Sequence, residues 1–480
     1  MAAEHPMPAV ALPTDVPRDF VLGAATAAYQ CEGETLTHGK GKVAWDDYLA
    51  ERGLFSADPA SDFYHRYPED LRLCHDYGID GIRVSIAWSR IFPTGTGKVN
   101  LEGVTFYHRL FAECRAQGVE PYVTLHHFDT PDALYREGDF LNRAAIDAFE
   151  RYARFCFEEF PEVTHWFTFN EIWAVVSNMY IEATWPRGQL CRLDLAFQAM
   201  HNMMVAHARA VLAFDELGHR GEIGVVHALS TKYPDDPDDA GDVAAAANED
   251  VLNNQFLLDA TFDGSYSESS LDCARRLARR AGGSLELPEE DMEQLKAAAP
   301  LNDCLGINYY QSNFLKAYDG PNELHHNATG EKGTERYALA GVGERVNRPE
   351  IPRTDWDWLI YPQGLYDLIM RITEQWPNCG AILVTENGMG AKDELIDDEV
   401  HDVERIDYIR QHLGWTLKAR SEGADVRGYF VWSLMDMFSW TNGYNKRYGL
   451  FYVDFDTQER IPKDSAEWYA RVSRERRLDK

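Results

Sequence analysis

Cysteine pairs, long apolar runs and basic side chains are all scarce in this sequence of 480 residues. Its eight cysteines are scattered and form no C-x-x-C pair, which excludes a small disulfide scaffold and a zinc ribbon. No run of ~18 apolar residues is present, so no membrane-spanning helix is expected. Residues 1–20 lack the cationic and apolar regions of an export signal, and we expect a reduced, cytoplasmic protein.

Basic residues are outnumbered, with 47 Lys and Arg against 78 Asp and Glu, which gives a formal net charge of −31. A general nucleic-acid binder needs basic surface to neutralise phosphates, and an anionic membrane repels such a chain, so neither partner is expected. A small anionic ligand would need a local cationic pocket. With 45% hydrophobic and 12% aromatic residues, the chain has enough apolar side chains to fold.

Nucleotide and metal motifs are absent as well. No G-x-G-x-x-G follows a predicted strand, and the sequence GTGK at 95–98 lacks the upstream glycine of a phosphate-binding loop. His126 and His127 are adjacent on a predicted strand and would point to opposite faces. Together with Asp129 and His165 they make a poor chelating set. We therefore expect neither a cofactor nor a metal ion.

Short apolar runs that end in polar or aromatic residues recur along the chain, separated by longer amphipathic stretches. The runs are predicted strands at 20–25, 81–85, 120–126, 165–170, 221–227, 304–310, 381–386 and 426–433. Helices are predicted at 61–77, 144–160, 195–217 and 404–421. This alternation is typical of a parallel sheet covered by helices.

The predicted fold class is α/β. Eight such units fit a single (β/α)₈ TIM barrel, one domain over residues 1–480 with long loops at the C-terminal face. A doubly wound sheet is the alternative, which periodicity does not exclude. Segments 319–353 and 234–242 are the least regular, and we expect them on the rim that would carry the active site.

Two glutamates stand at the ends of predicted strands, each beside an asparagine. One is Glu171 in the sequence TFNEI, and the other is Glu386 in VTENG. Although they are far apart in the chain, a barrel brings the C-terminal ends of its strands around one mouth. Two facing carboxyl groups are what cleavage of a glycosidic bond requires. The alternative is that each glutamate is a solvated cap at a strand end.

Further polar and aromatic residues at strand ends would suit a sugar, which has polar edges and an apolar face. These residues are Gln30, His127, Asn170, Asn308, Tyr310 and Trp432. Each also has a structural explanation, since Trp432 could belong to the core and His127 could be buried and satisfied.

Six motifs in chain order resemble glycoside hydrolase family 1. They are FVLGAATAAYQCEG from Phe20, RVSIAWSRI from Arg83, TFNE from Thr168, NYY from Asn308, TENG from Thr385 and YFVWSLMD from Tyr429. The resemblance covers nearly the whole chain and implies a (β/α)₈ barrel and a retaining double displacement.

By match of motif, the resemblance implies that Glu171 is the general acid/base and Glu386 the nucleophile. It further implies nucleophile-orienting and sugar-binding sets. The orienting set is Arg83, Tyr310 and Asn308; the sugar-binding set is Gln30, His127, Asn170, Trp432 and, in the leaving-group site, Trp358. One departure is Ile172, which stands where many members have proline.

A second departure concerns the last motif, where Ser439 occupies a position that is generally Glu in members acting on unphosphorylated glucosides. A carboxylate there would repel a phosphate on O6. Ser439, Lys446 and Tyr448 are the set seen in the branch that hydrolyses 6-phospho-β-glycosides, and they supply two hydroxyls and a cation. They would form the cationic pocket that an anionic ligand needs. An ordinary solvated loop lysine is the alternative.

Trp440, next to Ser439, resembles the branch acting on 6-phospho-β-galactosides, where an indole N–H can reach an axial O4. We therefore expect retaining hydrolysis of such substrates, for example a phosphorylated disaccharide such as lactose 6-phosphate. The alternatives are a 6-phospho-β-glucosidase, an unphosphorylated β-glycosidase and, more remotely, a non-catalytic sugar-phosphate binding protein. Homo-oligomerisation is left open.

Overall fold

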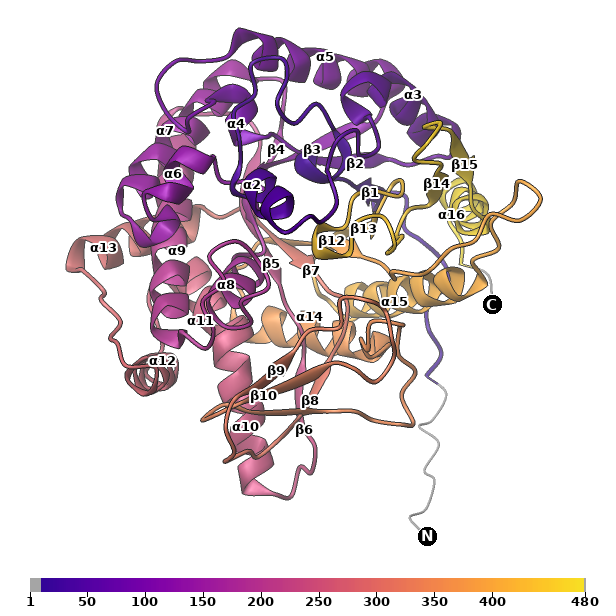
Figure 1. Cartoon of the computed structure of the whole chain (residues 1–480). Helices are drawn as coiled ribbons and strands as arrows, with labels where there is room; N and C mark the ends of the chain where they lie inside the picture. Colours follow the sequence, from indigo (N-terminus) through magenta and orange to yellow (C-terminus); the bar gives the residue numbers. More distant parts are fainter. Residues whose placement is uncertain (1–9, 479–480) are drawn as a thin grey trace.

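The structure is a computed structural model that describes residues 10–478. Residues 1–9, on which part of the expectation about an export signal rests, and residues 479–480 lie outside the described range. At the centre is a closed barrel of eight parallel strands in the order β1-β13-β12-β7-β5-β4-β3-β2 (Figure 1). The closed ring confirms the predicted (β/α)₈ barrel and excludes the doubly wound sheet.

The barrel strands coincide with the eight predicted apolar runs to within two residues. They are β1 Val21–Ala25, β2 Gly81–Ser85, β3 Glu120–His126, β4 His165–Asn170, β5 Glu222–Ala228, β7 Cys304–Asn308, β12 Ala381–Asn387 and β13 Val426–Trp432. Every residue of β2, β7 and β12 is buried. Such continuous burial is typical of parallel strands covered on both faces, which explains why their sequences are apolar without alternation.

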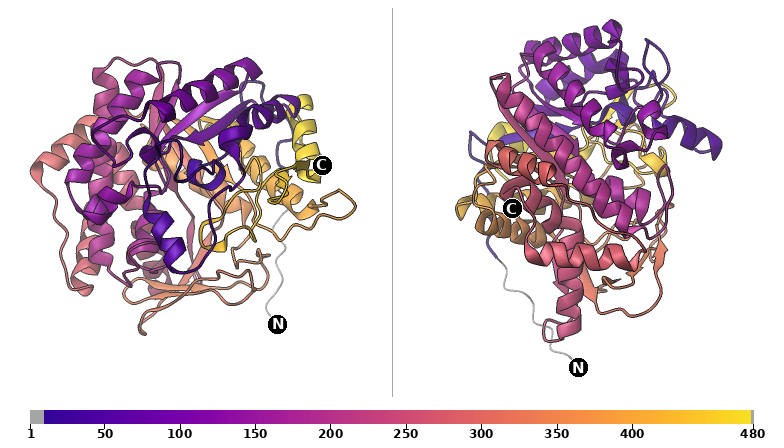
Figure 2. Two further views of the ribbon diagram at one scale, coloured as in Figure 1. Left: turned by 45° about the horizontal axis from the view of Figure 1, so that its top comes forward. Right: turned by 90° about the vertical axis from the view of Figure 1, so that its left-hand side faces the viewer.

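Helices surround the barrel, as the two views of Figure 2 show. The longer ones are α3 Phe63–Asp76, α5 Leu101–Gln117, α7 Ala144–Glu159, α9 Leu193–Glu216, α12 Glu268–Arg280, α14 Pro362–Gln375, α15 Val403–Ser421 and α16 Asp464–Glu475. The four predicted helices correspond to α3, α7, α9 and α15. Helix α5 ends at Gly118, which takes the left-handed conformation with φ 70°.

Shorter helices lie in the connections. They are α1 Ala28–Cys31, α2 Ala44–Glu51, α4 Trp88–Ile91, α6 Asp132–Arg136, α8 Ile172–Tyr180, α10 Ala240–Asp250, α11 Phe256–Leu258 and α13 Glu289–Ala298. No helix within residues 10–478 is both long and apolar enough to cross a membrane. The eight cysteines are unpaired, and seven of them are buried.

Segment 319–353, predicted to be irregular, instead contributes three of the five strands of a second sheet. The strands are β6 Lys232–Pro234, β8 Asn313–Lys316, β9 Glu323–His325, β10 Arg336–Leu339 and β11 Gly343–Val346, in the order β6-β8-β11-β10-β9. The remaining strands, β14 Phe451–Val453 and β15 Arg460–Pro462, form a separate pair. In Figure 1 the second sheet lies beside α10, to one side of the barrel.

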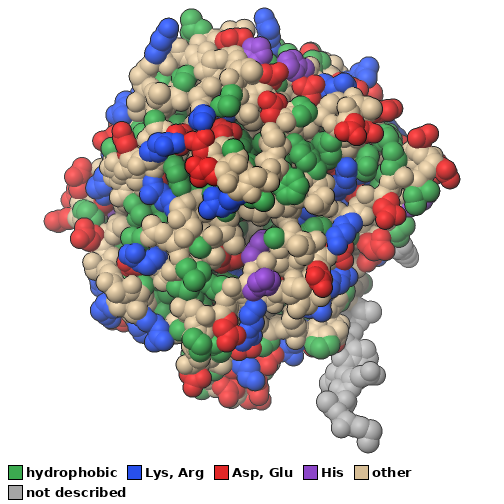
Figure 3. Space-filling model, in the orientation of Figure 1, with side chains coloured by type: hydrophobic (Ala, Val, Ile, Leu, Met, Phe, Trp, Pro, Cys, Tyr) green, Lys and Arg blue, Asp and Glu red, His purple; other side chains and the backbone are tan. Residues whose placement is uncertain are grey.

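Charged side chains of both signs are spread over the face seen in Figure 3. Acidic side chains gather at its lower end, where Figure 1 places the β6–α10 segment. That segment contains the acidic run 235–242. The acidic side chains on this face are therefore concentrated at that end, whereas Arg83 and Lys446, discussed below, are buried.

Candidate active site

The two predicted carboxylates lie in one cavity at the C-terminal ends of the barrel strands. Glu171 directly follows β4 and caps α8, with left-handed backbone angles of φ 48° and ψ 64°. Glu386 lies in β12, where the strand register shifts against both neighbouring strands. Both line a cavity of about 210 Å³. A positive φ is costly for a residue with a side chain, and such strain is concentrated at functional sites.

Glu386 is held from both sides. The Nη1 atom of Arg83 donates to Oε1 of Glu386, and the hydroxyl of Tyr310 donates to Oε2 at 2.7 Å. Arg83 is itself fully buried and fixed by Nη2 donating to Asn170 Oδ1 at 2.7 Å and Nε donating to Thr124 Oγ1 at 3.1 Å. The orientation of the carboxylate is therefore set before any ligand enters.

Asn308 lies between the two carboxylates. Its Nδ2 donates to Oε1 of Glu171 at 2.7 Å and to Oδ1 of Asn170 at 3.0 Å. Thr385 Oγ1 donates to Asn308 Oδ1 at 2.7 Å and so fixes which way the amide faces. Burial raises the pKa of both Glu171 and Glu386, and the Asn308 amide acts against that rise in each, so the role predicted for Asn308 at Glu386 extends to Glu171.

The surroundings of the two carboxyl groups place the proton on Glu171. Removal from water and the nearby Glu386 charge raise the pKa of Glu171 to about 8. Burial also raises the pKa of Glu386, but the Arg83 guanidinium and the Tyr310 hydroxyl act against that shift. Since only Glu386 has a cation in contact, its ionised form is the better stabilised of the two. Near neutral pH the pair can therefore supply an acid, Glu171, and an ionised carboxylate, Glu386.

The predicted sugar-binding side chains line the same cavity with the exception of Asn170, which is fully buried and bonded to Arg83 and Asn308. Gln30 donates its Nε2 to the Phe438 carbonyl at 2.8 Å, while its buried Oε1 has no partner among the described residues. His127 Nε2 lies 3.2 Å from Asn170 Nδ2, which assigns the ring proton to Nδ1. Burial and the Arg83 charge lower the pKa of His127, so its imidazole is neutral. An acceptor and a donor are thus available to neighbouring hydroxyls.

Two tryptophans add apolar surface to this arrangement. The Trp432 ring is nearly parallel to that of His127, with centroids 5.8 Å apart. Trp358 packs against Tyr310 at 5.5 Å and lines both this cavity and an adjoining one of about 220 Å³. Glu171 also lines both cavities, whereas Glu386 lines only the first, so the two cavities meet at Glu171. The adjoining cavity has the position required of a leaving-group site.

Ser439, Lys446 and Tyr448, predicted to hold a phosphate, line the first cavity and are each less than one-tenth exposed. The Nζ atom of Lys446 lies 3.8 Å from the ring centroid of Trp358 and 5.4 Å from that of Tyr448. Burial lowers the pKa of Lys446 to about 7. A buried ammonium group without a carboxylate in contact is costly, and a bound anion would offset that cost.

Sequence reasoning missed two residues that shape this part of the cavity. At Gly390 an added Cβ would lie 2.6 Å from Lys446 Cε and 3.0 Å from Tyr448 Cζ, so only glycine leaves room for both side chains. Trp356 stands 4.6 Å from the Lys446 ammonium and donates its indole N–H to Asn442 Oδ1 at 3.0 Å. Gly390 is the last residue of the sequence TENGMG and could have indicated a close contact. Its contacts, Lys446 and Tyr448, are 56 and 58 positions further along the chain, so the sequence did not identify them.

Trp440 is fixed in an aromatic cluster at the edge of the same cavity. Its ring stacks on Tyr29 with centroids 5.5 Å apart and planes 5° from parallel, and it also contacts Trp45 at 4.6 Å. Ser439 N donates to the Gly443 carbonyl at 2.7 Å, which closes the short turn that carries Trp440. The indole is therefore held rigidly where it lines the cavity.

A parallel barrel with two carboxylates at its mouth, one held by a guanidinium and one protonated, defines a glycoside hydrolase. The sequence model described as Glycosyl hydrolase family 1 matches residues 12–478. The chain belongs to this family, as its six motifs indicated.

Proteins from Staphylococcus aureus strains JH9 and N315, each named 6-phospho-beta-galactosidase, are 57% identical over 460 residues, covering 95% of this chain and 98% of theirs. Among solved structures, a family 1 β-glucosidase from Thermotoga maritima matches with TM-score 0.87 and 35% identity, covering 97% of this chain and 100% of that chain. A psychrophilic β-glucosidase from Micrococcus antarcticus matches with TM-score 0.87 and 34% identity, covering 96% and 98%. The structural similarities agree with the barrel.

Proposed function

We propose that this enzyme hydrolyses 6-phospho-β-D-galactosides with retention of configuration, releasing galactose 6-phosphate and an alcohol or sugar. The observation that carries the proposal is a single cavity lined by both Glu171 and Glu386 and by Ser439, Lys446 and Tyr448. The relatives named 6-phospho-beta-galactosidase add support, because they are similar over 95% of the chain.

In the proposed mechanism Glu386 attacks the anomeric carbon while Glu171 donates its proton to the leaving oxygen. A covalent glycosyl-enzyme forms, and its formation neutralises Glu386. Because the Glu386 charge is one cause of the raised pKa of Glu171, that pKa falls and Glu171 can then accept a proton from water. Water attacks the same anomeric carbon and releases the product with its original configuration.

Trp440 supports the choice of galactose over glucose. The two sugars differ in whether O4 is axial or equatorial, and a rigid indole at the cavity edge can favour one of the two positions. A 6-phospho-β-glucosidase is the alternative activity, and an unphosphorylated β-glycosidase would leave Lys446 buried without a partner for its charge.

Lactose 6-phosphate is the substrate we propose by example, which would place the enzyme in lactose catabolism in the cytoplasm. The aromatic and polar side chains described all come from the barrel and its loops, and this supports one domain acting alone.

The configuration of the first product tests the mechanism. The enzyme is mixed with 4-nitrophenyl 6-phospho-β-D-galactoside, and the anomeric proton is followed by NMR before mutarotation. We expect the β-anomer of galactose 6-phosphate to appear first. An α-anomer as the first product would contradict the double displacement, and no release of nitrophenol would contradict the proposed activity.

Lys446→Ala is expected to reduce kcat/KM for the phosphorylated galactoside by about 100-fold, because charge-assisted hydrogen bonds contribute about 1.5–3 kcal/mol each. The same variant should act almost normally on 4-nitrophenyl β-D-galactoside. Lys392→Ala is the matched control, since Lys392 lies 5.8 Å from the Trp356 ring but does not line the cavity. Equal losses on both substrates would contradict the phosphate site.

The pH dependence should differ between phosphorylated and free galactosides. Lys446, with its pKa lowered to about 7, loses its charge as pH rises through that value, whereas Glu171 keeps its proton up to about pH 8. The alkaline fall in kcat/KM should therefore begin at lower pH for the phosphorylated substrate than for the free galactoside. Because kcat/KM reports the free enzyme, pH profiles for the two substrates measure this directly. Coincident alkaline limbs would count against the role of Lys446.

A further inference from the structure

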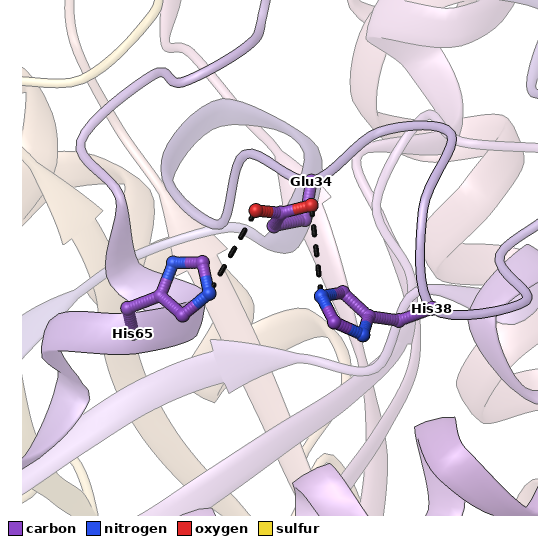
Figure 4. Close-up of side chains that lie close together, drawn as sticks. All are labelled: Glu34, His38 and His65. Carbon is purple, nitrogen blue, oxygen red and sulfur yellow. Dashed lines mark ion pairs between the residues drawn. The ribbon is translucent and has the colours of Figure 1, made fainter.

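A group of three side chains that the proposed reaction does not use lies outside the cavity. Glu34 and His38 belong to the connection between α1 and α2, and His65 is in the first turn of α3. One ligand atom from each, the two imidazole nitrogens and a carboxylate oxygen, lie within 4.8 Å of one another. Figure 4 shows the Glu34 carboxylate between the two imidazole rings.

The distances between these atoms fit a shared metal ion. His38 Nε2 lies 3.7 Å from Glu34 Oε2, and His65 Nε2 lies 3.7 Å from Glu34 Oε1. Two ligands at ~2.1 Å from a tetrahedral ion stand about 3.4 Å apart, so only a small contraction is needed. At 3.7 Å each contact is a long ion pair and not a hydrogen bond, so the carboxylate and the two rings lie close together without direct hydrogen bonding.

The other nitrogen of each imidazole contacts a separate carboxylate. His38 Nδ1 lies 2.6 Å from Glu102 Oε1, and His65 Nδ1 lies 2.6 Å from Asp62 Oδ1. A carboxylate at Nδ1 orients each ring so that its Nε2 faces the Glu34 carboxylate. Carboxylate–histidine–metal chains are built in this way, and the outer carboxylate orients the ring and makes it a better ligand.

We propose that Glu34, His38 and His65 bind one divalent transition-metal ion of the Zn²⁺ type. Two imidazoles and a carboxylate suit zinc, whereas Mg²⁺ and Ca²⁺ prefer oxygen ligands alone. The side chains are 25–51% exposed, so solvent water can supply a fourth ligand. The net charge of −31 further favours a cation at the surface.

The bound ion would join three parts of the chain. The ligands come from the connection after α1 and from α3, and Glu102 in the first turn of α5 supports His38. The connection starts directly after Gln30 and α1, which contribute to the wall of the cavity. Zinc binding should therefore stabilise this segment of the rim. The proposed zinc site is distinct from the hydrolytic site.

Zinc titration of the chelator-treated, full-length protein tests the proposal. With excess Mg²⁺ present to occupy weak carboxylate sites, we expect one Zn²⁺ per chain by calorimetry and a higher Tm with zinc. His38→Ala and His65→Ala should each weaken binding by at least 10-fold. Glu102→Gln should weaken it by about 10- to 100-fold, the effect usual for partners of metal-bound histidines.

His401→Ala is the matched control. His401 is a surface histidine that lies 3.4 Å from Glu399 and 2.9 Å from Asp464. It stands between two carboxylates without a second histidine, so its replacement should leave the zinc affinity unchanged. Anomalous diffraction at the zinc edge should place the ion between Glu34, His38 and His65 in the unaltered protein, independently of how the variants fold. No stoichiometric zinc, zinc bound elsewhere, or unchanged affinity in the His38 and His65 variants would overturn the proposal.

Discussion

Glu386→Gly is expected to lower kcat by roughly 10⁴-fold or more, the scale of loss when a covalent nucleophile is removed. Glu386 is the carboxylate that Arg83 and Tyr310 hold in place in the cavity, and the variant removes it. The measurement is turnover of 4-nitrophenyl 6-phospho-β-D-galactoside, with circular dichroism and Tm to verify that the variant folds.

Azide provides the positive test of this variant. Glycine leaves room for a small anion at the position of the missing carboxylate, so azide should restore turnover and yield the α-galactosyl azide 6-phosphate. The unaltered enzyme, whose Glu386 occupies that space, serves as the control and should gain nothing. Near-native activity of Glu386→Gly without azide would contradict the assignment of the nucleophile.

Glu171→Gln should have the second-largest effect, and the size should depend on the leaving group. Lactose 6-phosphate needs a proton on its leaving oxygen, so we expect kcat/KM to fall by ~10³-fold, within the usual range for general acid catalysis. Nitrophenol leaves without help, and its release in the first step should be much less affected. Comparison of kcat/KM for the two substrates measures the difference.

Azide again distinguishes the role of the residue. In Glu171→Gln the glycosyl-enzyme should accumulate, because no base activates water, and azide should then attack it to give the β-configured azide. The opposite configurations of the azide products assign the two carboxylates separately. Equal losses on lactose 6-phosphate and the nitrophenyl substrate would contradict the role of Glu171 as the acid.

The barrel and its carboxylate pair could be predicted because they depend on local patterns. Each barrel strand is a buried apolar run, and the closure of eight such strands brings Glu171 and Glu386 together although they are separated by more than 200 positions. Protonation of Glu171 could not be predicted in this way. It depends on the distance to Glu386 and on Arg83 contacting only one of the two.

The second sheet escaped prediction because its strands have three or four residues and are partly exposed. Its first strand, β6, pairs with β8 from a segment about 80 residues further on, and no local pattern encodes that pairing. The phosphate set was found only through resemblance. Ser439, Lys446 and Tyr448 converge because Gly390 leaves room for the last two and because a tight turn begins at Ser439. Both features depend on how separate loops pack together.

Parallel kinetics on three substrates test the central claim most directly: 4-nitrophenyl β-D-galactoside, its 6-phosphate, and the corresponding 6-phosphoglucoside. The account predicts that kcat/KM is highest for the 6-phosphogalactoside, at least ~100-fold above the free galactoside because of the buried cation and hydroxyls, and above the 6-phosphoglucoside because of Trp440. A free galactoside hydrolysed as efficiently as its 6-phosphate would contradict the account.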